Sequence, residues 1–185
     1  MRPESLREKY IKGDLQGAIE DFSQAIVLDP NYVKAYYNRG IVRYLLGDNK
    51  GAIADYSQAL RIDPNLFQAY VNRGNARDDS GDSQGAIADY NQALRINPSD
   101  SKAYYNRGVT RSRLGEHQSA IADYNEALRI NPNYALAYNS RGHGRAELGD
   151  KQGAIQDFQK AADLFQKQGD TNSYNKAIKE LKKLQ

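Results

Sequence analysis

Apolar and small residues recur along this chain with the spacing of helices. They return at intervals of three and four positions, as at Ala52, Tyr56 and Ala59. This spacing places them on one face of a helix, and no segment shows the period of two that marks a half-buried strand. The pattern predicts an all-α chain in which stripes of this kind face each other inside helix pairs.

The pattern is organised by a repeat of 34 residues. Residues 36–40 return at 70–74, 104–108 and 138–142, and residues 51–56 return, with variations, at 85–90, 119–124 and 153–158. A proline closes the second helix of each unit; these are Pro30, Pro64, Pro98 and Pro132. A fixed period of this length indicates a stack of identical supersecondary units that bury their apolar faces against their neighbours.

The turns follow the same period. A glycine and an acidic residue separate the two helices of a unit, at Gly47-Asp48, Gly81-Asp82, Gly115-Glu116 and Gly149-Asp150. Glycine can take the left-handed conformation that ends a helix, and the acid can cap or favour the next one. A polar residue follows each proline, and we expect it to cap the next first helix. These residues are Asn31, Asn65, Ser99 and Asn133.

These features resemble the tetratricopeptide repeat, whose signature is an aromatic residue, a glycine, and then alanine, aromatic, alanine and proline. In residues 33–66 the signature is carried by Tyr36, Gly40, Ala52, Tyr56, Ala59 and Pro64. The resemblance covers essentially the whole chain. It implies a right-handed superhelical solenoid of antiparallel helix pairs, whose first helices line a concave groove that binds proteins or peptides.

We expect a single domain over residues 1–185, with full repeats at 33–66, 67–100, 101–134 and 135–168. Residues 1–32 form an incomplete repeat with only a stub of its first helix, roughly Glu4 to Lys12. Residues 169–185 form a C-terminal capping helix, because a lysine-rich amphipathic stretch would solvate the last repeat. The incomplete start leaves a second interpretation open, in which the chain is a segment of a longer array or self-assembles.

Arginine occupies the packing stripe of every first helix, where most tetratricopeptide repeats carry leucine and tyrosine. Arg39 and Arg43 share this stripe with Gly40, and a buried guanidinium needs a partner. The second helix offers Asp55. We interpret the columns as an internal ion-pair ladder: Arg39 with Asp55, Arg73 with Asp89, Arg107 with Asp123, and Arg141 with Asp157. Because two arginines face each aspartate, a phosphate-binding or RNA-binding stripe is the alternative.

The groove face consists of first-helix positions displaced from the packing stripe. We expect partner contacts from Lys34, Tyr37, Asn38, Tyr44, Asn72, Asn75, Lys102, Tyr105, Asn106, Arg113 and Asn139, and helical spacing also places Val71 there. Asn38, Asn72 and Asn106 form a column of amides, which can both donate to and accept from a peptide backbone. The resemblance implies that such a column holds the main chain of an extended segment.

Another binding mode of the family, a clamp on a partner's C-terminal carboxylate, fits poorly. At the five positions that form the clamp, only Asn72 and Lys102 carry the expected residue types. The sequence therefore disfavours a clamp of this kind and favours sequence-tolerant binding of an extended segment.

Composition narrows the function further. The chain has no cysteine and only two histidines, which stand at no metal-ligand spacing, so we expect no metal, no cofactor and no enzyme activity. The net charge of +3 arises from interspersed signs, which disfavours nucleic acid. No apolar run is long enough to predict membrane insertion. The absence of cysteine favours a reducing compartment such as the cytoplasm, although a periplasmic protein fits almost as well.

Overall fold

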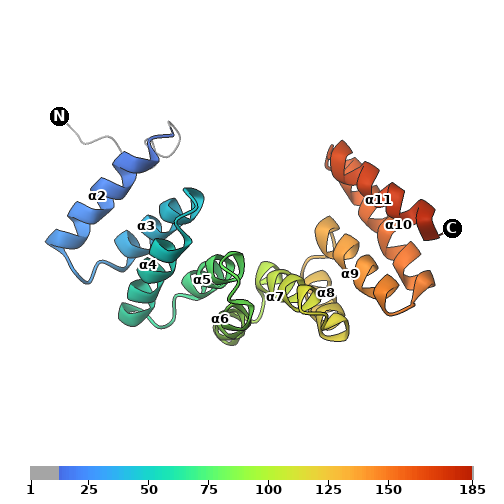
Figure 1. Ribbon diagram of the computed structural model, residues 1–185, viewed down its shortest axis with the longest axis horizontal. Coiled ribbons are helices and arrows are strands. Elements are labelled where there is room, and N and C mark those ends of the chain that lie inside the picture. The colour runs from blue at the N-terminus through green and yellow to red at the C-terminus, as the bar shows by residue number, and fades with distance from the viewer. Residues whose placement is uncertain (1–12, 185) are drawn as a thin grey trace. The chain divides into compact units, whose positions relative to one another are not determined.

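A computed structural model of the protein describes residues 13–184 (Figure 1). These residues form ten helices and no strand, which confirms the all-α prediction. The chain divides into two compact units, Met1–Ile96 and Asn97–Gln185. The predicted helical stub from Glu4 to Lys12 lies outside the described residues.

Each unit is built from consecutive helices joined by short turns. Unit 1 contains α2 (Leu15–Leu28), α3 (Val33–Leu45), α4 (Asn49–Ile62), α5 (Phe67–Asp79) and α6 (Ser83–Ile96). Unit 2 contains α7 (Ser101–Arg113), α8 (His117–Ile130), α9 (Ala135–Glu147), α10 (Lys151–Lys167) and α11 (Thr171–Leu184).

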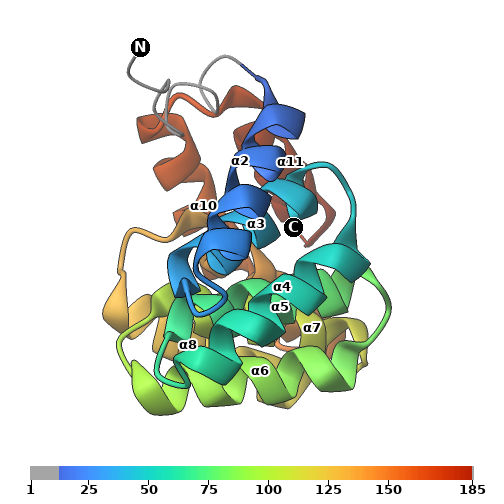
Figure 2. The same ribbon diagram turned by 90° about the vertical axis from the view of Figure 1, so that its left-hand side faces the viewer.

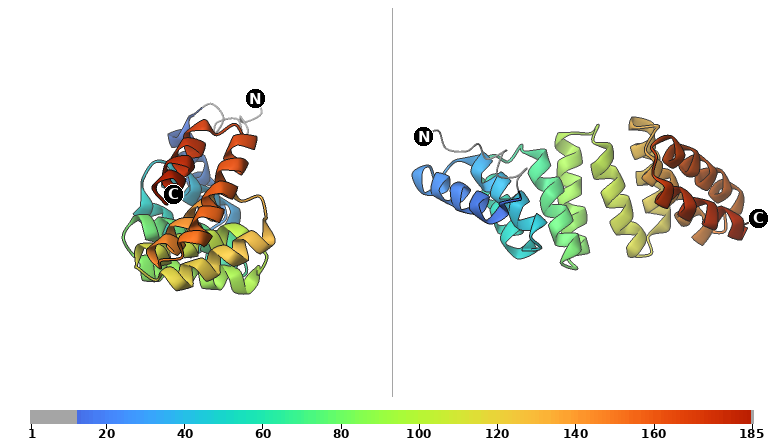
Figure 3. Two further views of the ribbon diagram at one scale, coloured as in Figure 1. Left: turned by 90° about the vertical axis from the view of Figure 1, so that its right-hand side faces the viewer. Right: turned by 90° about the horizontal axis from the view of Figure 1, so that it is seen from above.

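The helices pack as antiparallel pairs, α3 with α4 and α5 with α6 in unit 1, and α7 with α8 and α9 with α10 in unit 2. Each pair lies inside one predicted repeat. In unit 1, α2 packs against α3 (Figure 2). In unit 2, α11 packs against α10 as the predicted final helix (Figure 3). That all repeats form a single domain stays a prediction.

The turn inside each pair has the predicted chemistry. Gly47 and Gly81 adopt positive φ angles of 80° and 88°, in the left-handed region that glycine enters without a steric penalty. The carboxylate of Asp48 accepts a hydrogen bond from the Gly51 N–H at 2.9 Å and so caps α4. Glu116, whose side chain is longer, makes no such bond at the start of α8.

The caps predicted directly after the prolines are wrong. α5 begins after Leu66, one residue later than a cap at Asn65 would place it, and it has no side-chain cap. The residue before the proline makes the local hydrogen bond instead, since Asp63 Oδ1 accepts from the Asn65 N–H at 2.9 Å. An aspartate or asparagine at this place forms a turn with its own backbone, so Asn65 acts as the donor in a turn and not as a cap.

The glycine of the signature lets the two helices of a pair approach closely. A Cβ atom added to Gly40 would lie 2.7 Å from Cε1 of Tyr56, and Tyr56 is only 1 % exposed. Gly74 meets Tyr90 at the same distance. The large ring on the second helix therefore fills the space that the missing side chain leaves on the first helix. Within the described residues, no helix is long and apolar enough to cross a membrane.

Candidate functional site

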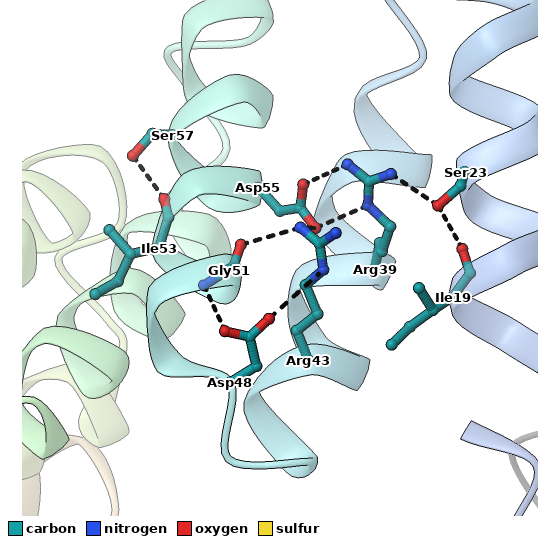
Figure 4. A network of polar contacts seen from close by, with 9 residues as sticks. All are labelled: Ile19, Ser23, Arg39, Arg43, Asp48, Gly51, Ile53, Asp55 and Ser57. Carbon is teal, nitrogen blue, oxygen red and sulfur yellow. Dashed lines mark hydrogen bonds and ion pairs between the residues drawn. The ribbon is translucent and has the colours of Figure 1, made fainter. Parts of the chain in front are cut away.

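The packing stripe of repeat 33–66 holds a network of charged side chains (Figure 4). Asp55, which is 2 % exposed, accepts hydrogen bonds from Arg39 Nε at 2.9 Å and Arg39 Nη2 at 2.7 Å. Arg43 Nη1 donates to Oδ2 of the same carboxylate at 2.8 Å. A bidentate arginine and a second charged donor on one buried carboxylate form strong, directional bonds, so Asp55 fixes α4 against α3.

The structure brings the predicted pair together in every full repeat. The Nη2–Oδ1 distance is 2.6 Å in both Arg73–Asp89 and Arg141–Asp157, and Arg107 makes the same contact with Asp123. Each of these arginines also lies over the ring of a tyrosine three residues earlier, with 5.7 Å from the guanidinium carbon of Arg39 to the Tyr36 ring centre. This contact adds a cation–π attraction.

The second arginine of each repeat is also neutralised. Arg43 Nη1 donates to the Gly51 carbonyl at 3.4 Å, and Arg43 Nε lies 3.9 Å from Asp48 Oδ2. The equivalent arginine–acid distances are 3.7 Å at Asp82 and 3.6 Å at Asp150. Two arginines therefore face two acids in each of these repeats, and the surplus of positive charge that motivated the phosphate or RNA stripe is absent from this network.

The first arginine also reaches the repeat before its own. Arg39 Nη1 donates to Ser23 Oγ on α2 at 2.9 Å, and Arg73 Nη1 donates to Ser57 Oγ on α4 at the same distance. In unit 2, Arg141 Nη1 donates to Asn125 Oδ1 at 2.6 Å. Each guanidinium thus joins three helices. Sequence reasoning missed these acceptors, although a hydroxyl or amide stands 16 residues before each of these arginines.

The predicted groove face of unit 1 lies on α3 and α5, and two hydrogen bonds join these helices. Asn72 Nδ2 donates to the Tyr37 hydroxyl at 3.1 Å, and the Tyr44 hydroxyl donates to Asp79 Oδ2 at 2.6 Å. Burial raises the pKa of Tyr37, and burial together with Asp79 raises the pKa of Tyr44 to about 12. Both hydroxyls are therefore protonated at neutral pH.

A pocket of about 420 Å³ opens at one end of this face. Three of the predicted groove residues, Lys34, Tyr37 and Asn38, line it. Its remaining lining residues are Val33, Asp63, Leu66 and Gln68. Apolar carbon, two amides and one charge of each sign thus surround a space of side-chain size.

Two residues placed on this face by spacing have packing roles. Val71 is only 9 % exposed, so its assignment to the groove surface is wrong. The reason is that α5 contacts α3 and α4 as well as α6. A helix with neighbours on several sides needs a wider apolar stripe than a helix with a single neighbour. Asn75 Oδ1 accepts a hydrogen bond from the hydroxyl of buried Tyr90 at 2.8 Å, and so supports the core of unit 1.

In unit 2 the corresponding face lies on α7 and α9. Lys102 and Arg113 are exposed on α7, whereas Asn106 and Asn139 are half-buried. The ring of Tyr105 lies 4.9 Å from that of Tyr134 and 6.0 Å from that of Tyr124, measured between ring centres. Burial raises the pKa of Tyr134 to about 12. Tyr134, which the sequence analysis did not select, thus forms an aromatic surface together with Tyr105.

No group of three or more histidine, cysteine, aspartate or glutamate side chains within residues 13–184 could hold a metal ion. His143 is exposed on α9, and its ring packs edge-on against Phe158 with 4.9 Å between ring centres.

Known proteins agree with this architecture. Among solved structures, MamA is 28 % identical, with a TM-score of 0.85 over 91 % of this chain and 99 % of that chain. YrrB, described as a TPR protein with an unusual peptide-binding site, is 21 % identical, with a TM-score of 0.76 over 94 % of this chain and 88 % of that one. The first TPR of Spaghetti (RPAP3), bound to the HSP90 peptide SRMEEVD, is 27 % identical, with a TM-score of 0.62 over 63 % of this chain and 93 % of that one.

A search of curated proteins gave no match. A family model described as TPR repeat matches residues 7–47, 42–81 and 79–115. A second, described as tetratricopeptide repeat, matches residues 101–134. Together these matches span well over half of the sequence, and the helix pairs and signature glycines lie where such repeats require them. The chain belongs to the tetratricopeptide repeat family.

Proposed function

We propose that the chain is a non-catalytic scaffold that binds an extended segment of a partner protein along its first helices. The observation that carries this proposal is the groove face of unit 1. There, the amides of Asn38 and Asn72 lie on neighbouring first helices, and the pocket of about 420 Å³ beside Asn38 can take a side chain. Amides that alternate with side-chain pockets are suited to an extended peptide.

Asn72 keeps hydrogen-bonding capacity for such a ligand. One of its N–H groups is donated to the Tyr37 hydroxyl at 3.1 Å. Within the described residues, the side-chain carbonyl makes no hydrogen bond. An asparagine amide has two donors and one acceptor oxygen, so a carbonyl and an N–H remain to pair with one peptide unit of a partner. Tyr37 holds the amide in place through the hydrogen bond that it accepts.

The comparison with Spaghetti (RPAP3) supports peptide binding, because that related structure holds an HSP90 peptide. Recognition in this chain follows a different chemistry, since Tyr37 and Ile41 stand at two positions where a carboxylate clamp needs a lysine and an asparagine. We therefore assign the affinity of the groove to the backbone of the partner and to its side chains in the pocket, and not to a terminal carboxylate.

RNA binding is disfavoured as the function, because the arginines that suggested it are paired with aspartate inside the repeats. Self-association stays an alternative, and light scattering on the purified chain tests it. A strict monomer would disfavour the self-assembly interpretation.

The test begins with peptides selected from a random display library on the full chain and measured by calorimetry. Asn72→Ala should weaken binding by about 0.5–3 kcal/mol, the range for a hydrogen bond lost or left unpaired, or roughly 2- to 150-fold. Gln84→Ala removes an exposed amide from α6 and is the matched control, which should bind normally. Methylating backbone amides of the peptide should weaken binding more than changing most of its side chains.

The internal hydrogen bond of Asn72 needs its own control. Tyr37→Phe removes the hydroxyl that positions the Asn72 amide but keeps the amide itself. Comparing it with Asn72→Ala therefore separates the effect of moving this amide from the effect of removing it. If the triple replacement of Asn38, Asn72 and Asn106 by Ala leaves binding unchanged, the partner binds elsewhere and the proposed groove is wrong.

A further inference from the structure

The net positive charge of this chain is concentrated in its last helix. Of 26 basic and 23 acidic residues in the sequence, four lysines and one glutamate lie in α11, a net charge of +3. The rest of the sequence then holds 22 basic and 22 acidic residues, so its net charge is zero. Positive and negative charges are therefore balanced in the remainder of the chain, whereas α11 is predominantly positive.

The outer face of α11 carries these lysines around a shallow hollow. Ala177 and Leu181 are buried against α10, whereas Lys176, Lys179 and Lys182 are exposed. Figure 3 shows α11 beside α10 at the C-terminal end of unit 2. The hollow has a volume of about 480 Å³, and we call its lining the lysine face: Asn175, Ile178, Lys179, Lys182 and Lys183.

The charges of the lysine face are only partly neutralised. Lys183 Nζ pairs with Glu180 at 2.7 Å, but the structure gives neither Lys179 nor Lys182 an ion pair within the described residues. The C-terminal end of a helix favours cations, which accounts for Lys182 and Lys183 in the last turn. It does not account for Lys179 one turn earlier, where a like charge three residues away slightly destabilises the helix.

We propose that the lysine face binds a short acidic segment of a partner protein, separately from the groove. The charge is complementary to glutamate or aspartate, and half-buried Ile178 offers an apolar floor for their aliphatic carbons. A membrane surface fits less well, because α11 buries its apolar face against α10 and cannot insert it between lipids. Nucleic acid fits less well too, because this face has no aromatic ring for stacking and no arginine fork.

The test uses the full chain and a fluorescein-labelled hexaglutamate peptide, followed by fluorescence anisotropy at low and moderate salt. The double variant Lys179→Gln/Lys182→Gln should lose roughly 2- to 30-fold in affinity, as expected for two exposed ion pairs. Its salt dependence should also become weaker. The control Lys151→Gln/Lys160→Gln removes the same charge from exposed positions on α10 and should lose less than about twofold if binding is local.

Equal losses in both double variants would overturn the proposal, because attraction would then depend on net charge alone. The proposal would also fail if an oligouridylate or anionic vesicles bound through Lys179 and Lys182 while hexaglutamate did not. Because these side chains are exposed, we expect the variants to keep the helical circular dichroism of the parent chain.

Discussion

The two faces of the first helices differ in how strictly they repeat. On the packing face the same chemistry returns in each full repeat, with a bidentate arginine on a buried aspartate. On the groove face one position changes completely between repeats. It carries Tyr44, Asp78, Ser112 and Ala146. A position where three helices meet tolerates few side chains, whereas the half-buried variable position accommodates side chains of different size and charge.

The asparagine column is the exception on the groove face, because it recurs at Asn38, Asn72 and Asn106. Its residues are half-buried, and Asn72 donates one N–H to the Tyr37 hydroxyl. The position before the column varies, as Tyr37, Val71, Tyr105 and Asn139. Repetition on a face that is otherwise variable is the reason for assigning the column to ligand binding and not to packing.

The largest expected effect tests the packing face. Asp89→Ala should lower the free energy of unfolding by about 3–5 kcal/mol, because it leaves Arg73 and Arg77 without their shared, buried carboxylate. Urea unfolding followed by circular dichroism measures this change. The control is Asp79→Ala, which removes an exposed carboxylate of the groove face.

Asp79→Ala loses only the hydrogen bond from Tyr44 and should cost about 1 kcal/mol or less. Equal effects of the two aspartate variants would erase the distinction between the faces and would restore the interpretation of the arginines as ligand-binding groups.

A smaller effect is expected from the glycine beneath the aromatic ring. In Gly74→Ala the new Cβ would lie 2.7 Å from Tyr90 Cε1, so the buried ring must move, at a cost of about 1–3 kcal/mol. Alanine's better helix propensity would offset up to about 1 kcal/mol of this. Gly144→Ala is the control, because its Cβ would meet only the flexible Ile121 side chain at 3.3 Å, and thermal unfolding should show it near neutral.

The sequence was sufficient to predict what the repeat itself determines. The period of 34 residues placed the helix pairs, and the shared stripe of Arg39 and Asp55 predicted their ion pair, which forms at 2.7 Å. These predictions worked because a position that recurs in each unit has the same neighbours each time. Local turn chemistry was predicted only in part. Asp48 caps α4 as expected, but the Asn65 N–H bonds to Asp63 in a turn, and α5 begins only after Leu66.

Contacts that depend on how several helices pack together could not be predicted from the sequence. Ser23 was missed as the acceptor for Arg39 because the two residues come from different repeats, and only the recurring 16-residue spacing connects them. Val71 was misplaced because one stripe cannot describe a helix that packs on two sides. The charge of α11 was visible in the sequence, but its significance required knowing which face of that helix α10 covers.

The smallest effect concerns the hydrogen bond between Tyr44 and Asp79, which joins two groove-face residues of unit 1. The equivalent positions in unit 2 carry Ser112 and Glu147, so this bond is a feature of one unit and not of the repeat. Tyr44→Phe should therefore lower stability by no more than about 1 kcal/mol at neutral pH. If Tyr44→Phe lowered stability as much as Asp89→Ala, the groove face would contribute as much to stability as the packing face does.

The pH dependence of this variant isolates the hydroxyl. The folded chain raises the pKa of Tyr44 to about 12, through burial and then Asp79, from an ordinary value of about 10. Because the unfolded chain releases this proton first, the stability contributed by the protonated hydroxyl is complete below about pH 10 and is lost as the pH rises toward about 12. Urea unfolding at pH 9 and pH 11 should therefore show a smaller loss for Tyr44→Phe than for the parent chain. An identical loss in both would mean that Tyr44 does not hold its proton against Asp79, and that the groove of unit 1 lacks this link between α3 and α5.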